Sequence, residues 1–256
     1  MIKITFLGTG TSQGIPVIGS DHPVSFSEDL KDKRLRSSIL IEYKDFNFVI
    51  DCGPDFRQQM LRTNCRKLDA IIFTHEHADH TTGIDDVRPY FFRQGKIPIY
   101  LHERVLNSLH NRFAYIFDPK QKYPGAPDFE VNLITKENDF QILGLNITPI
   151  EAVHYKLPVL GFRLGKFAYL TDVKTISDKE MLKLNGLDTL VINALRYESH
   201  PSHLNIEEAL EIIDQVKPKQ TFFTHISHNM GFHEEVCSNL PKSVSLAFDG
   251  LVLEVD

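Results

Sequence analysis

The pattern of hydrophobic and polar positions predicts a chain in which strands alternate with helices. Short runs of β-branched and aromatic residues between turn residues indicate strands. These runs cover 2–7, 38–43, 46–50, 69–74, 97–101, 140–143, 145–150, 159–164, 167–171, 189–193, 220–224, 244–247 and 251–255. Apolar positions three and four apart, with capping residues before them, predict helices over 54–64, 103–113, 177–184 and 205–216. The proline-rich stretch 115–128 is expected to be a loop.

The order of these elements predicts an α/β or α+β sandwich. Each half of the chain carries several strands followed by strand–helix units, which favours two packed sheets with helices outside them. The chain has no repeat of fixed period, no low-complexity tract and no long linker. A single domain over residues 1–256 is therefore expected.

Composition and charge exclude several classes of protein. Hydrophobic residues make up 42% and charged residues 24%, as in ordinary globular proteins. No apolar run approaches the roughly 20 residues of a membrane span, and the first residues alternate like a strand rather than a leader peptide. The net charge of −6 argues against a nucleic-acid partner, and three scattered cysteines argue against a disulfide framework. We expect a cytoplasmic protein.

The strongest chemical signal is the stretch 74–80, Thr-His-Glu-His-Ala-Asp-His, which directly follows a predicted buried strand. Four metal-ligand side chains fall within six residues: His75, His77, Asp79 and His80. Neutral imidazoles and a carboxylate suit zinc or manganese. One metal cannot readily use all four, so this spacing favours two metals a few ångströms apart.

Two metals need further ligands, and the same position in the fold supplies candidates. Asp172 and His225 come directly after predicted strands, and His154 follows another one a few residues later. Strand ends are where side chains from distant parts of a chain converge. With the first four residues, these three complete a predicted site of five histidines and two aspartates.

This pattern resembles the metallo-β-lactamase superfamily over essentially the whole chain. The resemblance implies an α/β fold of four layers, the αβ/βα sandwich, with a binuclear metal site at one edge. It assigns His75, His77 and His154 to one metal and Asp79, His80 and His225 to the other, with Asp172 as the bridge. It implies two divalent ions per chain, and the donor types are compatible with zinc, manganese and iron.

Three further motifs are similar to those of the PhnP-type phosphodiesterases, which are relatives of ribonuclease Z. These motifs lie at 6–16, 34–38 and 200–204. The resemblance implies a hydrolase of small phosphodiesters, cyclic ones included, that acts through a hydroxide bridging the metals. It places His203 where this branch carries the histidine that protonates the leaving group, with His200 as the alternative, and it lets Asp79 orient the hydroxide. Relatives of this type also form homodimers.

One departure from this branch concerns a separate structural zinc, which relatives hold with three cysteines and one histidine. The cysteine positions read Ser20, His22 and Ser25 here, while His228 retains the histidine. Serine hydroxyls are poor substitutes for thiolates as zinc ligands. We expect this third site to be empty or weak, and His22 and His228 to be ordinary polar residues.

Other functions stay open at this point. The same metals could serve a thioester, lactone or lactam hydrolase, a ribonuclease Z-like RNA phosphodiesterase, or a metal-binding module without activity. The negative charge counts against RNA, and the absence of a closed cysteine site counts against a structural module. Arg88 could either reach a substrate phosphate or pair with Asp85 or Asp86.

Overall fold

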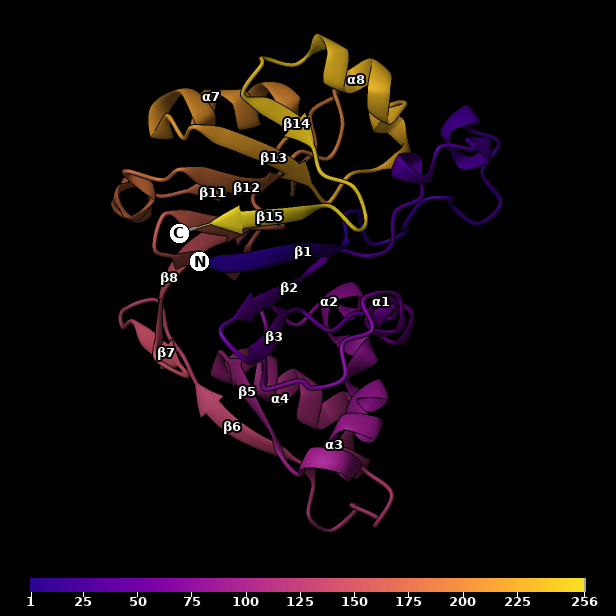
Figure 1. Cartoon of the computed structure of the whole chain (residues 1–256), viewed down its shortest axis with the longest axis vertical. Coiled ribbons are helices and arrows are strands. Elements are labelled where there is room, and N and C mark those ends of the chain that lie inside the picture. The colour runs from indigo at the N-terminus through magenta and orange to yellow at the C-terminus, as the bar shows by residue number, and fades with distance from the viewer. Residues whose placement is uncertain (256) are drawn as a thin grey trace.

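The chain folds into two β-sheets packed face to face, with helices on both outer sides (Figure 1). The computed structural model describes residues 1–255. The first sheet has the strand order β15-β1-β2-β3-β4-β5-β6. Its strands are β1 (Ile2–Gly8), β2 (Ser38–Tyr43), β3 (Phe46–Ile50), β4 (Ala70–Ile72), β5 (Ile97–Leu101), β6 (Phe129–Leu133) and β15 (Val252–Val255).

The second sheet is built from the later part of the chain and has the order β11-β8-β9-β10-β12-β13-β14, with β7 paired to β8. Its strands are β7 (Phe140–Ile142), β8 (Leu145–His154), β9 (Leu157–Leu164), β10 (Phe167–Leu170), β11 (Thr175–Ile176), β12 (Thr189–Asn193), β13 (Gln220–Thr224) and β14 (Val244–Leu246).

The helices lie on the two outer faces of this sheet pair (Figure 1). They are α1 (Phe56–Arg62), α2 (Ala78–Thr81), α3 (Arg88–Gln94), α4 (Glu103–Arg112), α5 (Ala114–Phe117), α6 (Asp178–Met181), α7 (Ile206–Val216) and α8 (His233–Asn239), with short 3-10 turns η1 (Pro23–Phe26), η2 (Leu30–Asp32), η3 (Thr82–Val87), η4 (Leu182–Leu184) and η5 (His228–Met230). Within residues 1–255, none of them combines the length and the apolar character that crossing a membrane requires.

The buried side chains confirm the predicted four-layer αβ/βα sandwich. Ile4 and Phe48 from the first sheet meet Phe162 and Tyr169 from the second in a core between the sheets. A second core joins the first sheet to α1, α3 and α4, and a third joins the second sheet to α7 and α8. Strand β12 is buried along its whole length, as expected for a central strand covered on both faces.

Both sheets change from antiparallel to parallel pairing, and this change creates the edge where the site lies. Strands β3, β4, β5 and β6 run parallel, as do β10, β12, β13 and β14. Parallel strands end at the same edge of a sheet, where ligands of α/β proteins bind. The chain segments that follow β3, β4, β10 and β13 therefore converge there.

Most predicted elements are present, and the differences have local causes. Helix α1 begins at Phe56 and not at residue 54, because the backbone amide of Phe56 first closes a turn onto the carbonyl of Gly53 (3.1 Å). Strand β4 stops at Ile72 because the amide of Thr74 leaves the ladder for the carboxylate of Asp51 (2.9 Å). Part of the predicted loop 115–128 belongs to the short helix α5.

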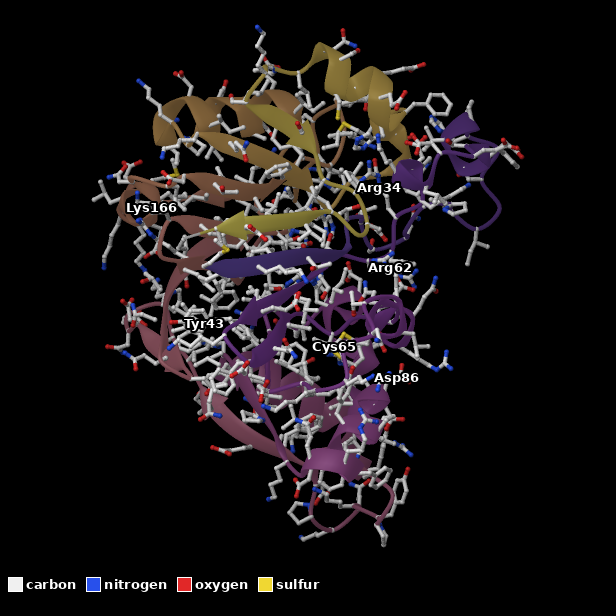
Figure 2. The ribbon with its side chains drawn as sticks, in the orientation of Figure 1. Arg34, Tyr43, Arg62, Cys65, Asp86 and Lys166 are labelled. Atoms are coloured by element: carbon white, nitrogen blue, oxygen red, sulfur yellow. The ribbon has the colours of Figure 1, made fainter. Side chains whose placement is uncertain are left out.

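Buried Arg34 fixes the long N-terminal segment to the C-terminal half (Figure 2). Its guanidinium donates to the hydroxyl of Thr9 (2.8 Å) and to the carbonyl of Ala247, and lies 3.1 Å from Nδ1 of His233. Burial lowers the pKa of Arg34 to about 10, so it stays charged at neutral pH. This contact holds the glycine-rich loop beside the site.

Candidate metal centre

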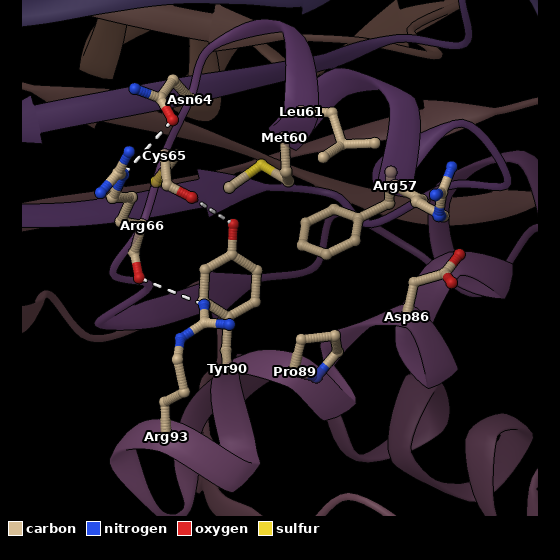
Figure 3. Close-up of a pocket in the computed structure, with 11 residues that line it drawn as sticks. Arg57, Met60, Leu61, Asn64, Cys65, Arg66, Asp86, Pro89, Tyr90 and Arg93 are labelled. Atoms are coloured by element: carbon tan, nitrogen blue, oxygen red, sulfur yellow. Dashed lines mark hydrogen bonds between the residues drawn. The ribbon is translucent and has the colours of Figure 1, made fainter.

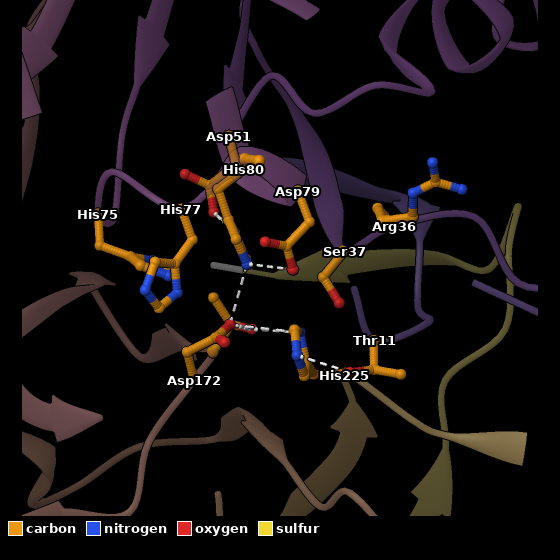
Figure 4. A network of polar contacts seen from close by, with 12 residues as sticks. Thr11, Arg36, Ser37, Asp51, His75, His77, Asp79, His80, Asp172 and His225 are labelled. Carbon is orange, nitrogen blue, oxygen red and sulfur yellow. Dashed lines mark hydrogen bonds and ion pairs between the residues drawn. The ribbon is translucent and has the colours of Figure 1, made fainter. Parts of the chain in front are cut away.

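The histidine-rich stretch lies where β4 ends, and a single turn of helix shapes it (Figure 4). His75 and His77 stand in the loop before α2, with ring centroids 4.6 Å apart. His80 lies on α2, and its ring is 4.3 Å from that of His75. Asp79 precedes it, with Oδ2 3.3 Å from Nε2 of His80. The four residues predicted from their spacing therefore lie in one cluster.

Asp51 is a site residue that the sequence analysis missed. It follows β3 with φ 67°, a left-handed conformation that ordinary residues rarely adopt. Its Oδ2 lies 2.7 Å from Nδ1 of His80, and both side chains are fully buried. The hydroxyl of Thr74 also donates to Oδ2 (2.9 Å). The carboxylate thereby directs Nε2 of His80 into the site, and its position directly after a buried strand was the available signal.

Asp172 occupies the centre of the cluster, where the resemblance placed the bridging ligand. It follows β10 with φ 59°, and it is buried. Its Oδ2 lies 3.1 Å from Nε2 of His80 and 3.2 Å from Nδ1 of His225. Its Oδ1 lies 3.9 Å from Nε2 of His154 and 3.8 Å from Nδ1 of His203. One carboxylate thus faces both halves of the ligand set.

His154 and His225 enter the site from the second sheet. His154 ends β8, and its Nδ1 donates to the carbonyl of Ser202 (2.7 Å). Because a carbonyl can only accept, this bond fixes the tautomer and leaves Nε2 free to bind a cation. His225 follows β13 with φ 55°, and one ring nitrogen lies 3.0 Å from the hydroxyl of Thr11. The glycine-rich loop therefore supports a predicted metal ligand.

His203, the residue for which a catalytic role was predicted, also lies in the cluster. It is buried, with its ring 4.5 Å from His154 and 4.8 Å from His225. Burial and the neighbouring His225 lower its pKa to about 2, so the ring is neutral. His200 lies further out, 5.2 Å from His203, and contacts the hydroxyl of Ser202 (3.1 Å).

Negative charge gathers around His80 and raises the pKa of its imidazole. Burial alone would lower the pKa of its imidazole, but the carboxylates of Asp79, Asp172 and Asp51 outweigh burial and raise it well above the usual value. For Asp172, burial raises the pKa, but His225 and His80 outweigh that effect and hold it well below the usual range. Buried carboxylates that need a cationic neighbour are suited to a divalent ion.

A second, independent observation indicates that the cluster is suited to metal ions. Three of its ring nitrogens are buried without a hydrogen-bond partner: Nε2 of His75, Nε2 of His80 and Nδ1 of His203. Ligand atoms lie within 4.8 Å of one another in the groups His75–His80–Asp172, Asp79–His80–His225 and His154–Asp172–His203. Buried polar atoms without partners are rare in folded proteins unless something binds them.

Other predicted residues have structural roles. Arg88 pairs with Asp85 (Nη2 to Oδ1, 2.6 Å), so of the two roles that were open the structure shows the ion pair. His22 caps η1, since its Nδ1 accepts from the amide of Val24 (3.3 Å), and its ring lies 5.2 Å from that of His228.

Two cavities adjoin the cluster on different sides. One of about 490 Å³ is lined by His77 and His154 together with Tyr155, Lys156 and Pro201. The other, of about 220 Å³, is lined by polar residues that include His203 and His200.

A third hollow, of about 570 Å³, lies between α1 and α3 (Figure 3) and contains none of the cluster's residues. Phe56, Met60 and Tyr90 form its apolar floor. This hollow is therefore not part of the predicted metal site.

Comparisons with known proteins agree with this geometry. Residues 46–226 match the family described as the Beta-lactamase superfamily domain. The crystal structure of a diphosphatase, described as a new member of the PhnP family, superposes with a TM-score of 0.93 at 39% identity, covering 100% of this chain and 98% of that one. A ribonuclease Z from Anoxybacillus flavithermus is 20% identical over 314 residues, covering 100% of this chain and 96% of the relative.

A protein of Porphyromonas gingivalis named octanoyltransferase is 38% identical over 257 residues. The match covers 100% of this chain and 52% of that protein, so the chain spans about half the length of this relative.

The family match over residues 46–226 shows that the chain belongs to the metallo-β-lactamase superfamily, and its fold and its histidine–aspartate cluster agree with that match. Within the superfamily it is of the PhnP and ribonuclease Z type, as its motifs predicted.

Proposed function

We propose that the protein is a metal-dependent phosphodiesterase that acts on a small phosphodiester. The observation that carries the proposal is the convergence of five histidines and two aspartates at the strand ends, with buried ring nitrogens that lack partners. Bound divalent ions would supply a Lewis acid for the phosphoryl oxygens and would lower the pKa of water.

The ligands would divide between two ions around a shared carboxylate. His75, His77 and His154 would hold one ion, and Asp79, His80 and His225 the other, with Asp172 between them. The distances from Asp172 to His80, His225 and His154 support this division. Zinc is our first choice, and manganese and iron are compatible with the same donors.

His203 would donate the proton to the leaving oxygen. Its ring is neutral without substrate, because burial lowers its pKa. An anionic phosphoryl group placed beside it would raise that pKa, since a nearby negative charge favours the imidazolium. Protonation would then accompany substrate binding, and the proton would pass to the oxygen of the breaking bond. Asp79 would orient the attacking water while it binds metal.

A second candidate is hydrolysis of a diphosphate linkage. The specific support is the PhnP-family diphosphatase, which is 39% identical across the whole chain. Both candidates are hydrolyses at phosphorus with an oxygen leaving group, so the same residues serve either.

Octanoyl transfer is not proposed for this chain. The relative with that name contains nearly as much sequence again outside the matched half. Acyl transfer through a covalent intermediate needs an activated nucleophile. Cys52 is fully buried in the apolar core, and burial raises its pKa well above the usual value, so it does not meet that need.

An assay panel tests the proposal. The protein loaded with zinc or manganese is given bis-p-nitrophenyl phosphate, a 2′,3′-cyclic nucleotide and bis(5′-adenosyl) diphosphate, beside a thioester, a lactone and a lactam. We expect turnover of the phosphorus substrates, loss of it in His75→Ala and His80→Ala, and no loss in the surface control His110→Ala. Turnover confined to the thioester, lactone or lactam would overturn the proposal.

The proposal also includes a small-molecule partner, a cytoplasmic location and a homodimer. Light scattering of the purified protein measures its assembly, and fractionation of cells measures its location. A monomer at micromolar concentration would contradict the homodimer and leave the chemistry in place.

A further inference from the structure

The smaller cavity beside the cluster carries a permanent positive charge, on Arg196, that the proposed hydrolysis of a simple phosphodiester does not use. It has a volume of about 220 Å³ and is enclosed by three separate segments: the glycine-rich loop, the 195–203 loop and the start of η5. Ser12, Gln13 and Asn229 contribute polar side chains, and His203 forms the border with the metal cluster. Among the described residues that line it, none is acidic and Arg196 carries the permanent charge.

Arg196 has donors that no protein group satisfies well. Its Nε is buried and has no hydrogen-bond partner. The nearest carboxylate oxygen, on Glu198, is 3.6 Å away, and that side chain is 72% exposed. Its Nη2 makes one long contact with the carbonyl of Ser199 (3.4 Å). A guanidinium with unsatisfied donors at the wall of a polar cavity is suited to an oxyanion, because its planar fork binds phosphate in a bidentate manner.

The backbone at Arg196 is held in place, although the contacts of its side chain with Glu198 and Ser199 are long. The carbonyl of Arg196 accepts from the amide of Ile206 (3.1 Å), the first residue of α7. The capping box of Asn205 and Glu208 holds that end of the helix. The backbone that carries the guanidinium is therefore fixed before a ligand arrives.

Size determines which part of a substrate this cavity can accept. Its volume lies below the 300–1,000 Å³ usual for whole drug-sized ligands, so it suits a small group. The larger cavity on the His77 side, with Tyr155, Leu157 and Pro201, has room for the bulkier part.

We propose that Arg196 and its cavity bind a second phosphoryl group, adjacent to the one that reacts at the metal cluster. The inference rests on the proposed function and narrows it: substrates with two linked phosphoryl groups are selected over simple phosphodiesters. Arg196 is a specificity-determining residue for that choice.

The test compares two substrates that differ by one phosphoryl group, bis(5′-adenosyl) monophosphate and bis(5′-adenosyl) diphosphate. Arg196→Gln should lower kcat/KM for the diphosphate 10- to 100-fold more than for the monophosphate, as expected for loss of a charged hydrogen-bond pair. Arg196→Lys should recover part of the loss, because lysine restores charge without the fork. Arg57→Gln, an exposed arginine on α1, is the matched control.

A binding measurement makes the result independent of turnover. By calorimetry, the zinc-loaded wild type should bind inorganic diphosphate at least tenfold more tightly than inorganic phosphate, and Arg196→Gln should remove that difference. Equal losses on both substrates, or unchanged diphosphate preference in the variant, would overturn the inference. If the wild type hydrolyses neither substrate, the proposed function fails, and the binding difference still decides whether the cavity prefers two phosphoryl groups.

Discussion

Asp51 and His80 form a fully buried pair in which carboxylate Oδ2 and ring Nδ1 are 2.7 Å apart. The carboxylate accepts the Nδ1 proton, so Nε2, which faces Asp172, is the ring nitrogen at which a cation would replace a proton. A carboxylate behind a ligating histidine fixes both the tautomer and the orientation of its ring.

Asp51→Asn should therefore weaken metal binding about 10- to 100-fold with little change in shape. The amide can donate to Nδ1, which favours the tautomer with its proton on Nε2 and removes the ligand. Competition with a chromogenic chelator measures the affinity. The control is Asp45→Asn in the exposed turn between β2 and β3. Unchanged zinc affinity in Asp51→Asn would show that the pair serves folding alone.

His203→Ala should reduce turnover of a phosphodiester by about 10²–10⁴ while leaving two metals bound, since general acid catalysis contributes about that much. The ring stands beside Asp172 and His154 at ligand distance, so metal content must be measured on the same sample. Loss of an ion together with activity would make His203 a metal ligand. His200→Ala, one step further from the cluster, should have a much smaller effect.

The fold and most of the cluster could be predicted from the sequence because their signals are local. His75, His77, Asp79 and His80 stand within six residues, and the other three follow recognisable strands. Asp51 follows a predicted strand as Asp172 does, but it was missed because its role depends on contact with Nδ1 of His80, 29 residues further along the chain. Arg196 was missed for a different reason: its importance depends on a cavity formed by three segments, which no spacing along the chain reveals.

Gly53→Ala should disturb the metal motif through the backbone. A Cβ at this position would stand 2.0 Å from the carbonyl oxygen of Asp79, which lies one residue before His80. The loop must move, so we expect unfolding free energy to fall by about 1–3 kcal/mol and metal affinity to fall as well. Chemical denaturation and chelator competition measure the two effects.

Gly186→Ala is the matched control, because it introduces backbone strain without the steric collision expected in Gly53→Ala. Its φ is 74° and nothing lies within 4 Å of the added Cβ. The variant should lose about 1 kcal/mol of unfolding free energy, because alanine is strained in the left-handed conformation. Its metal affinity should be unchanged. Equal metal affinity in both variants would contradict the role assigned to Gly53.

His233, which is not one of the predicted metal ligands, should make the free energy of unfolding depend on pH. Burial and the nearby charge of Arg34 lower its folded-state pKa to about 4, against about 6.5 in the unfolded chain. Because the unfolded chain binds this proton first, stability should fall as pH drops from about 6.5 to about 4, and then level off. His233→Asn keeps an acceptor for Arg34 and should remove this component. Urea midpoints of the two proteins across that range should converge at low pH; parallel curves would contradict the assignment.

Two metal ions per chain, and not three, are expected in the purified protein. At the position of the third site, two of the side chains are occupied by nearby backbone amides: Ser20 accepts from the amide of His22 (3.1 Å), and His22 accepts from the amide of Val24 (3.3 Å). Hydroxyls bonded in this way are weak zinc ligands. Elemental analysis should give two ions in the wild type and in His228→Ala, and fewer in His225→Ala. A third ion lost with His228 would show that a histidine pair and two serines can hold zinc here.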